Sequence, residues 1–478
     1  MIQQDPVLLA PGYVSTSKLN LNRKPTRTAK QGKIEKSLGM DNDTAYAPTS
    51  WSFKAYANIF EKFNYADPVK HDPEAWNIAK ELAYLEYAYM RGSKHTPFPL
   101  TAKNPDSTPG IPAMFEYDCE KDMVECEGLD CYHHALEELD NGKLDFLWYG
   151  FLKNEVIKRE KVEKEDIRLI CCAPAVYCRI GAYFEQEMNN RMKERCYERE
   201  AKVGWSPFGS DFNELMDEMN QNHEFMELDF TRYDGTIPDF VWSEVNNIRL
   251  SCYSGDHKNA YVNYRSNLHH RKMVLATGDM VVIDRGNPSG QYSTSPDNCI
   301  AHTLICAYLF TMWWKECSGE YPSIEDLNGF YRLFSYGDDH LSGFNLENKW
   351  AVETPKKDWM ILNAKEHLGM WIKPENIKTS KTLVGLTFCG LTIIRKGKRW
   401  VGRYKADKIF ASIVDPAQKV ETLEDMGAKI SSALLLTVHD NSHFSREILE
   451  IADRFQHLKP DWDRPTVGDL KAIWEGPK

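Results

Sequence analysis

A Gly-Asp-Asp tripeptide at residues 337–339 lies between two stretches that favour β-strands, 332–335 and 340–344. Such a tripeptide occurs by chance in about one chain in ten of this length, and a surface turn is then the simplest interpretation. The flanking apolar and aromatic residues change this, because they predict a tight β-hairpin around the tripeptide. The hairpin would hold Asp338 and Asp339 at the tip of a buried element.

A second acidic segment, LDFTRYDGTIP at 228–238, follows a short apolar strand predicted over 225–230, which ends next to Asp229. Adjacent carboxylates repel one another and are costly to bury unless a cation lies among them. Mg²⁺ prefers oxygen ligands and often binds through one or two carboxylates plus substrate phosphates. Asp229 and Asp338 could therefore share two ions about 4 Å apart, an arrangement that suits phosphoryl transfer.

A third segment, GNPSGQYSTSPDN at 286–298, leads into an apolar run over 294–314 that predicts a long helix buried on most sides. A helix-capping loop is one interpretation of this segment. The other is recognition of a sugar, because glycines permit close backbone approach while hydroxyl and amide groups can bind a ribose 2′-hydroxyl. The residues that would do so are Gly286, Gly290, Ser289, Thr294 and Asn298.

The charge balance limits how the chain could bind a polyanion. Its 59 basic and 70 acidic residues give a formal net charge of −11, which argues against binding nucleic acid through bulk charge. Local basic patches would be needed, and 18–36, 153–168 and 395–408 qualify. The first could lie against phosphates or strap one part of the protein to another. No secretory signal or membrane-spanning stretch is expected.

The 12 cysteines are scattered without repeated CxxC pairs, which predicts reduced thiols. Three of them lie near one histidine and have ligand types that suit zinc, although their spacing matches no familiar structural site. Zinc binding by this group stays open as an alternative: Cys119, Cys126, Cys131 and His133.

The three segments, in this order and spacing, resemble motifs A, B and C of viral RNA-dependent RNA polymerases of positive-strand RNA viruses, in the picornavirus-like supergroup. They are most similar to astrovirus polymerases. TPGIP at 108–112 resembles motif G, and 153–170 resembles motif F. The resemblance implies an α+β right-hand fold, with fingers, a palm built on an antiparallel sheet flanked by helices, and a mostly helical thumb.

The same resemblance implies a division of the chain. Fingers with an N-terminal arm would cover 1–205, the palm 206–264 and 287–390, a fingers insertion 265–286, and the thumb 391–478.

The resemblance also implies roles for particular residues. Catalytic and metal-binding roles fall on Asp229, Asp338 and Asp339, with Lys378 as the general acid of motif D. Nucleotide binding falls on Asp234, Ser289, Thr294, Asn298, Lys153, Lys164 and Arg168, and template binding on Thr108, Gly110 and Gly290. Lys153, Lys164 and Arg168 resemble the basic residues that line the nucleotide entry channel in this family; Lys158 and Lys161 compete for those positions, and Lys381 competes with Lys378. GLTFCGL at 385–391 resembles the motif E hairpin but lacks the basic residue that several relatives carry.

The implied activity is template-directed RNA synthesis with two Mg²⁺ or Mn²⁺ ions. Implied partners are an RNA template and product strand, ribonucleoside triphosphates, other viral replication proteins and a viral protein primer. The expected location is the host cytoplasm, in membrane-associated replication complexes. A reverse transcriptase is the nearest alternative, but such enzymes place a bulky aromatic residue where Asp234 stands. A non-catalytic RNA-binding scaffold would require no such agreement among the motifs.

Overall fold

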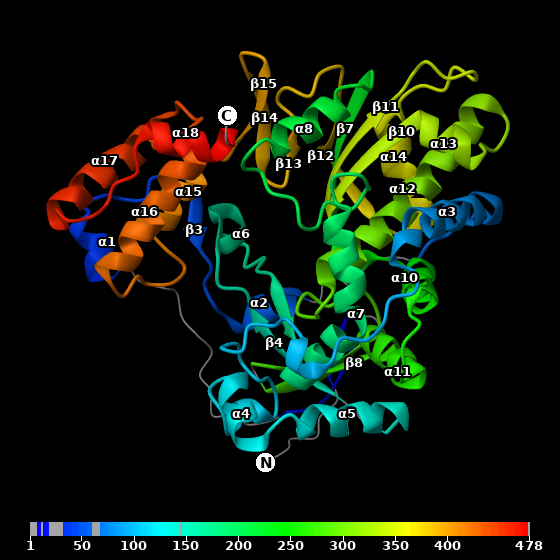
Figure 1. Ribbon diagram of the computed structural model, residues 1–478, viewed down its shortest axis with the longest axis horizontal. Helices are drawn as coiled ribbons and strands as arrows, with labels where there is room; N and C mark the ends of the chain where they lie inside the picture. Colours follow the sequence, from blue (N-terminus) through cyan, green and yellow to red (C-terminus); the bar gives the residue numbers. More distant parts are fainter. Residues whose placement is uncertain are drawn as a thin grey trace.

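The computed structural model describes residues 7–10, 13–18, 32–59, 67–143, 146–276 and 278–476. Figure 1 shows three groups of elements: a sheet with long helices beside it, a second sheet with helices below it, and a helical C-terminal group on the opposite side. The first group carries the acidic segments, so it is described first.

The central sheet has four antiparallel strands in the order β10-β11-β7-β12. They are β7 (Glu224–Thr231), β10 (Tyr331–Tyr336), β11 (Asp339–Phe344) and β12 (Trp371–Ser380). Gly337 and Asp338 link β10 to β11, and Gly337 has a φ of +63°. A glycine at the first position of a two-residue loop gives a turn whose twist matches its strands. The predicted hairpin and the predicted strand over 225–230 are confirmed.

Helix α12 (Thr294–Ser318) packs against this sheet, and all its residues from Pro296 to Trp314 are buried. The long helix predicted over 294–314 is confirmed and continues for one more turn. Neither α12 nor any other helix in the described ranges is long and apolar enough to cross a membrane. The other helices of this group are α3 (Pro73–Glu86), α8 (Asp211–Met219), α9 (Tyr233–Thr236), α10 (Asp239–Cys252), α13 (Ile324–Phe330) and α14 (Lys357–Leu368).

The second sheet has the strand order β1-β2-β9-β8-β4-β6, with β4 and β8 parallel and the other pairs antiparallel. Its strands are β1 (Val7–Ala10), β2 (Tyr13–Lys18), β4 (Leu147–Leu152), β6 (Leu169–Cys172), β8 (Arg271–Leu275) and β9 (Asp279–Ile283). Its helices include α2 (Phe53–Asn58), α4 (Glu120–Glu127), α5 (Asp130–Asp140), α6 (Arg159–Glu163), α7 (Ala175–Glu194) and α11 (Lys258–His269). Strand β6 leads into α7, whose buried face joins this sheet to the core around α12.

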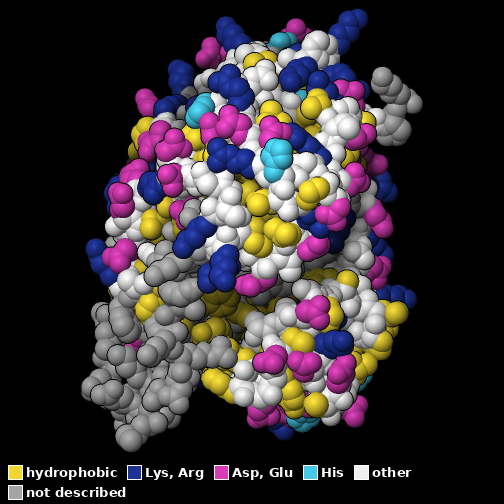
Figure 2. All heavy atoms as spheres, turned by 90° about the vertical axis from the view of Figure 1, so that its left-hand side faces the viewer, with side chains coloured by type: hydrophobic (Ala, Val, Ile, Leu, Met, Phe, Trp, Pro, Cys, Tyr) yellow, Lys and Arg dark blue, Asp and Glu magenta, His cyan; other side chains and the backbone are white. Residues whose placement is uncertain are grey.

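The C-terminal group begins with a three-stranded sheet and continues as four helices. These are β13 (Thr387–Phe388), β14 (Leu391–Lys396), β15 (Arg399–Arg403), α15 (Ala406–Val414), α16 (Leu423–Thr437), α17 (His443–Leu458) and α18 (Val467–Glu475). Figure 2 shows the side that carries these helices, where basic and acidic side chains are interspersed without a field of one sign.

The N-terminal segment crosses between the groups. Helix α1 (Lys33–Ser37) is followed by Leu38, which is buried among the C-terminal helices and whose carbonyl accepts a 2.8 Å hydrogen bond from Arg454. Strand β3 (Tyr46–Pro48) pairs with β5 (Val156–Lys158), and both contact α15. Residues 32–48 thus connect the C-terminal group to β5, with which β3 forms a separate two-stranded sheet. Residues 19–31 of the basic patch at 18–36 lie outside the described residues.

Candidate active site

Three predicted carboxylates meet at one end of the central sheet. Asp339 opens β11, Asp338 occupies the hairpin turn, and Asp229 lies near the end of β7. Strands β11 and β7 are neighbours, with His340 opposite Leu228, so Asp339 is carried next to Asp229. Residues more than a hundred positions apart in the chain therefore share one site.

The pKa of each of the three carboxylates is raised above its ordinary value. Displacement of water by the surrounding protein is the largest cause, and the charge of Asp338 adds to it, raising the pKa of Asp229 to about 6 and that of Asp339 to about 7. The pKa of Asp338 is also raised, by burial and then by Asp234, while Arg168 opposes this. None of the three forms an ion pair with a described residue, and all remain exposed to solvent. The site thus concentrates negative charge that a cation would neutralise.

Two cations from the motif F region face these acids. Arg168 binds both carboxylate oxygens of Glu155, and its charge also acts on Asp338 and Asp234. Lys161, on α6, lowers the pKa of Asp229. A guanidinium held in this way keeps a fixed orientation toward the site, which suits it to bind phosphate oxygens.

The other predicted channel residues lie nearby but point to different partners. Lys153 approaches Glu155 at 3.6 Å, and its backbone N–H donates to the Arg168 carbonyl at 2.8 Å. Lys164 forms an exposed 2.6 Å ion pair with Glu160 one helical turn away. The geometry therefore favours Lys161 over Lys164 as the second cation of the site, and the assignment of Lys164 stays a prediction.

The motif B loop holds the surrounding segments together. The backbone N–H of Asn287 donates to the Asp234 carbonyl at 2.7 Å. A Cβ on Gly286 would lie 2.5 Å from that same carbonyl oxygen, so only glycine permits the approach. Ser289 Oγ accepts from the Cys171 N–H at 3.1 Å and donates to the Leu169 carbonyl at 3.2 Å. The hydroxyl predicted to bind nucleotide thus joins the loop to β6.

Gly290 and the predicted motif G glycine have similar structural roles. A Cβ on Gly290 would lie 2.1 Å from the Cys171 carbonyl oxygen. Gly110, with a φ of +74°, packs against the backbone of Pro174 at the start of α7. Thr108 is exposed, and its hydroxyl accepts from the Gly110 N–H at 3.3 Å. Template binding by these residues stays a prediction.

The two remaining nucleotide-binding predictions lie on the first turns of α12. Thr294 donates through Oγ1 to the Pro288 carbonyl at 2.9 Å, which closes the loop. Asn298 is buried to all but 7% of its surface, and its Cβ lies 4.0 Å from the position that a Cβ of Gly337 would occupy. Asn298 therefore stands directly beside the carboxylate hairpin.

Strand β12 carries the predicted general acid. Lys378 lies opposite Glu227, which shares a face of the sheet with Asp229 two residues away. The β12 register shifts between Ile372 and Ile377, and the bulge brings Lys373 close enough to lower the pKa of Asp229. Sequence reasoning missed Lys373; its place before a proline five residues ahead of Lys378 was the available signal.

The motif E hairpin is tied to the same sheet. Glu227 accepts from the backbone N–H of Thr387 at 2.9 Å and from its hydroxyl at 2.6 Å. Thr387 begins β13, so the carboxylate joins β7 to the C-terminal group. The contact holds the hairpin against the central sheet without a basic side chain.

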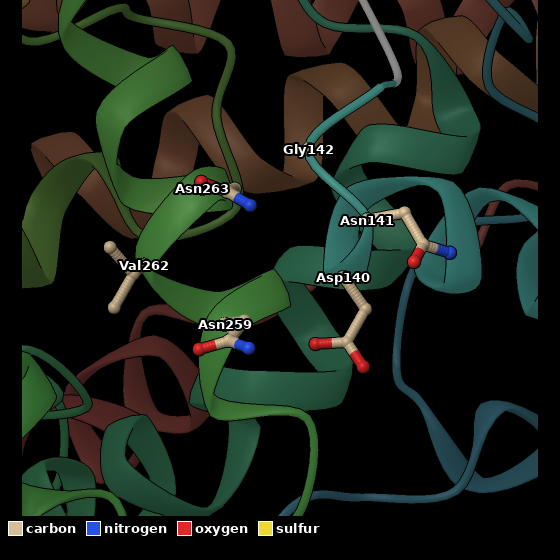
Figure 3. A pocket seen from close by; sticks show the side chains of 6 residues that line it. All are labelled: Asp140, Asn141, Gly142, Asn259, Val262 and Asn263. Atoms are coloured by element: carbon tan, nitrogen blue, oxygen red, sulfur yellow. The ribbon is translucent and has the colours of Figure 1, made fainter.

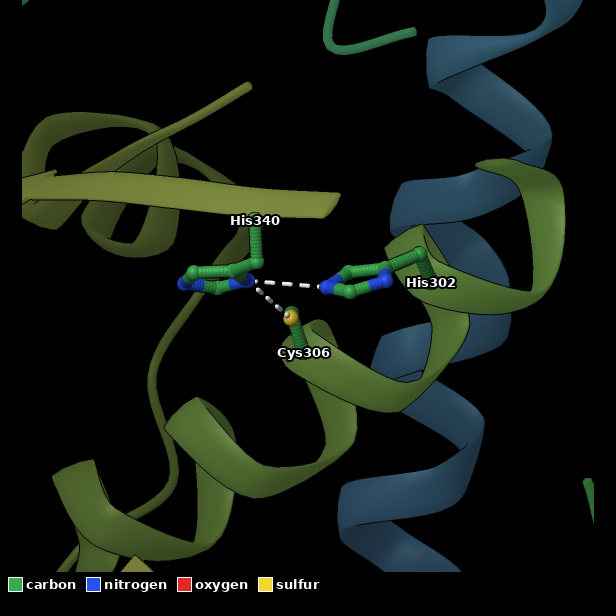
Figure 4. Close-up of side chains that lie close together, drawn as sticks. All are labelled: His302, Cys306 and His340. Atoms are coloured by element: carbon green, nitrogen blue, oxygen red, sulfur yellow. Dashed lines mark hydrogen bonds between the residues drawn. The ribbon is translucent and has the colours of Figure 1, made fainter. Parts of the chain in front are cut away.

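A buried cluster behind the hairpin could be mistaken for a metal site (Figure 4). His302 Nε2 lies 2.8 Å from His340 Nδ1, and Cys306 Sγ lies 3.6 Å from that same atom. Two nitrogen ligands of a tetrahedral zinc would lie about 3.3 Å apart. Burial lowers the pKa of His302 to about 3, so a neutral hydrogen-bonded chain accounts for the cluster.

The cysteine group considered for zinc does not converge. Among the described residues, only the His302 cluster brings three possible ligand atoms within 4.8 Å of one another. Cys131 instead donates to the Gly128 carbonyl at 3.3 Å, and Cys126 is exposed. Nothing in the structure favours zinc binding there.

A polar hollow between α5 and α11 also lies apart from the predicted site residues (Figure 3). Asp140 accepts from the Ala260 N–H at 3.0 Å, and Asn263 donates to the Leu139 carbonyl at 2.7 Å. Its polar groups are used to join the two helices.

The sheet, the hairpin acids at its end and the cations that face them form the arrangement expected of a right-hand nucleic-acid polymerase. A family model for viral RNA-dependent RNA polymerases matches residues 21–456. The chain therefore belongs to the viral RNA-dependent RNA polymerase family, as its motifs predicted.

Its relatives include astrovirus polyproteins. It is 32% identical to the non-structural polyprotein 1AB of avian nephritis virus 1 and 35% identical to that of turkey astrovirus 2, over 92% and 90% of this chain. The chain spans 29% and 27% of those polyproteins. A solved Sicinivirus 3Dpol RNA-dependent RNA polymerase shares the fold, with a TM-score of 0.72 at 16% identity, covering 95% of this chain and 98% of that one. The predicted right-hand α+β fold is confirmed.

Proposed function

We propose that the chain synthesises RNA on an RNA template from ribonucleoside triphosphates, replicating a positive-strand RNA virus genome with two divalent cations, Mg²⁺ or Mn²⁺. The observation that carries this proposal is the group of three carboxylates at the hairpin, whose mutual repulsion no described ion pair relieves. Their oxygen ligands and exposure fit hard divalent cations. Asp229, Asp338 and Asp339 would hold them.

The cations, when bound, would activate the attacking 3′-hydroxyl and stabilise the charge on the leaving pyrophosphate. The chain's own groups would do the rest. Arg168 and Lys161 would bind and orient the triphosphate, and Lys378, with Lys373 and Lys381 as competitors, would supply a proton to the pyrophosphate. Asp234 and Asn298 would bind the ribose, and the Ser289 hydroxyl would keep the motif B loop against β6.

The same proposal divides the chain into fingers at 1–205 with an insertion at 265–286, a palm at 206–264 and 287–390, and a thumb at 391–478. We further propose that RNA and other viral replication proteins are its partners, since its relatives are parts of larger polyproteins. A protein primer and a location in membrane-associated complexes of the host cytoplasm belong to the same proposal.

Primer extension on a homopolymeric RNA template, with and without Mg²⁺, tests this function. Wild-type protein should extend the primer only with the cation, and Asp338→Asn should reduce synthesis at least a hundredfold. Asp118→Asn, at an exposed position outside the site, is the matched control. Near-normal synthesis by Asp338→Asn would refute the metal assignment. A preference for deoxynucleotides would favour reverse transcription, and RNA binding without pyrophosphate release would favour a scaffold.

A further inference from the structure

A buried ion cluster lies directly behind the motif B loop. Arg249 Nε lies 2.8 Å from Asp297 Oδ1, and Arg265 lies 2.8 Å from Asp297 Oδ2. All three side chains are at most 1% exposed. Burial alone would raise the pKa of Asp297, but Arg265 and Arg249 hold it below its ordinary value. Asp297 is therefore a carboxylate whose oxygens can only accept hydrogen bonds.

This carboxylate orients the first of three amides. Gln291 donates from Nε2 to Asp297 Oδ2 at 3.0 Å, because its own oxygen in that place would repel the carboxylate. The same Nε2 donates to Asn287 Oδ1 at 2.6 Å. Gln291 Oε1 accepts from the backbone N–H of Ser293 at 3.3 Å, which agrees with this orientation.

The orientation of the Gln291 amide determines the orientations of the Asn287 and Asn298 amides. Because Asn287 accepts through Oδ1, its Nδ2 faces the opposite side and donates to Asn298 Oδ1 at 2.7 Å and to the Thr294 carbonyl at 3.0 Å. The Oδ1 of Asn298 is thereby occupied. Its Nδ2 must point the other way, where none of the described residues accepts a hydrogen bond from it.

We propose that Asp297, Gln291 and Asn287 are positioning residues that fix the amide of Asn298 so that its NH₂ group faces the ribose of the incoming nucleotide. The protein would then recognise the 2′-oxygen as a hydrogen-bond acceptor. This inference rests on the proposed function and adds the direction of the hydrogen bond, which the resemblance of Asn298 to a ribose-binding residue does not specify.

The direction of the hydrogen bond from Asn298 to the ribose predicts which 2′-substituents the protein tolerates. A 2′-fluoro group can accept but not donate, a 2′-amino group can do both, and a 2′-hydrogen can do neither. Wild-type protein should therefore use 2′-fluoro nucleotides better than 2′-deoxy ones. Asn287→Asp replaces the donor to Asn298 by an acceptor, so the Asn298 amide should turn and present its oxygen to the ribose.

The experiment compares kcat/KM for CTP and its 2′-amino, 2′-fluoro and 2′-deoxy forms in primer extension at pH 8, with Tm measured for each variant. In Asn287→Asp, the 2′-fluoro to 2′-amino ratio should fall about tenfold, because a weak hydrogen bond is replaced by repulsion between two acceptors. Tyr292→Phe is the control, since the Tyr292 hydroxyl contacts Gln186 at 3.4 Å and lies outside the hydrogen-bond relay of Asp297, Gln291 and Asn287. That variant should keep the wild-type ratio.

A second variant covers the case in which Asn287→Asp does not fold. Asn287→Leu can neither donate nor accept, so the Asn298 amide loses its fixed orientation and the preference for CTP over its 2′-deoxy form should fall about tenfold. A folded Asn287→Asp with the wild-type 2′-fluoro to 2′-amino ratio, or an Asn287→Leu with unchanged ribose preference, would overturn the relay alone. Wild-type protein that extends no primer with any ribonucleotide would overturn the proposed function as well.

Discussion

Replacing Asp339 by asparagine should stabilise the metal-free protein. The pKa of Asp339 is raised from 3.8 to about 7, first by burial and then by Asp338 and Asp229. That difference corresponds to roughly 4 kcal/mol. The surrounding protein displaces much of the water near Asp339, but the residue keeps a solvent-exposed surface. Screening by solvent and salt therefore reduces the expected gain in unfolding free energy to about 1–2 kcal/mol.

The pH dependence has a definite sign. The folded protein binds the Asp339 proton more tightly than the unfolded chain, so ionisation costs stability as pH rises from about 4 to about 7. The advantage of Asp339→Asn should therefore be complete above about pH 7, shrink as the pH falls, and vanish near pH 4. For 478 residues, the unfolding entropy is about 1 kcal/mol per degree, so the gain in Tm should be about 1–2 °C.

Differential scanning fluorimetry in EDTA at pH 8 and pH 5 measures this effect. Added Mg²⁺ should raise the Tm of wild-type protein more than that of Asp339→Asn, because the variant has lost a ligand and some of the repulsion that the cation relieves. Asp118→Asn again serves as the control. If Asp339→Asn were less stable than wild type at pH 8 in EDTA, the carboxylates would not be repelling one another as described.

Three further changes have definite expected outcomes. Arg168→Ala should raise the KM for nucleotides tenfold or more, with a Tm within about 1 °C of wild type, because its pair with Glu155 is exposed. Steady-state kinetics decide this, and an unchanged KM would count against a phosphate-binding role. Gly290→Ala should cost about 1–3 kcal/mol and at least tenfold in synthesis, since its Cβ would overlap the Cys171 carbonyl; wild-type activity would contradict the loop packing. Asp297→Asn should lower the unfolding free energy by about 3–5 kcal/mol, because it removes one acceptor and the negative charge that compensates buried Arg249, whereas Arg265 keeps its pair with Glu185; urea denaturation would measure this.

The sequence predicted those features that local chemistry determines. Gly337 and the strand-forming residues around it specify the hairpin, and the continuous apolar run after Pro296 specifies α12. The convergence of Asp229 with Asp338 depends on long-range strand pairing, and only the resemblance to a polymerase family predicted it.

Other parts of the site depend on geometry that residue types do not encode. Lys161 and Lys164 lie three residues apart on one short segment, and only the packing of α6 decides which of them faces Asp229. Lys373 approaches because a bulge shifts the register of β12. The role of Ser289 as a tie to β6 likewise follows from the path of the loop, since its hydroxyl alone suits a ligand equally well.

Asp297 and Asp338 lie in opposite electrostatic environments, although Asn298, next to Asp297 in the chain, lies beside the hairpin that carries Asp338. Asp297 has two guanidinium groups at 2.8 Å, so its charge is already neutralised and it would gain little from a divalent cation. Asp338, beside Asn298 across the hairpin, forms no such ion pair, and its pKa stays raised although the charge of Arg168 opposes that of Asp234. A cation should therefore bind at the hairpin and leave the ion cluster unaffected. In the function that we propose, the compensated carboxylate would orient the chain of amides toward the ribose, and the uncompensated carboxylates would bind the divalent ions.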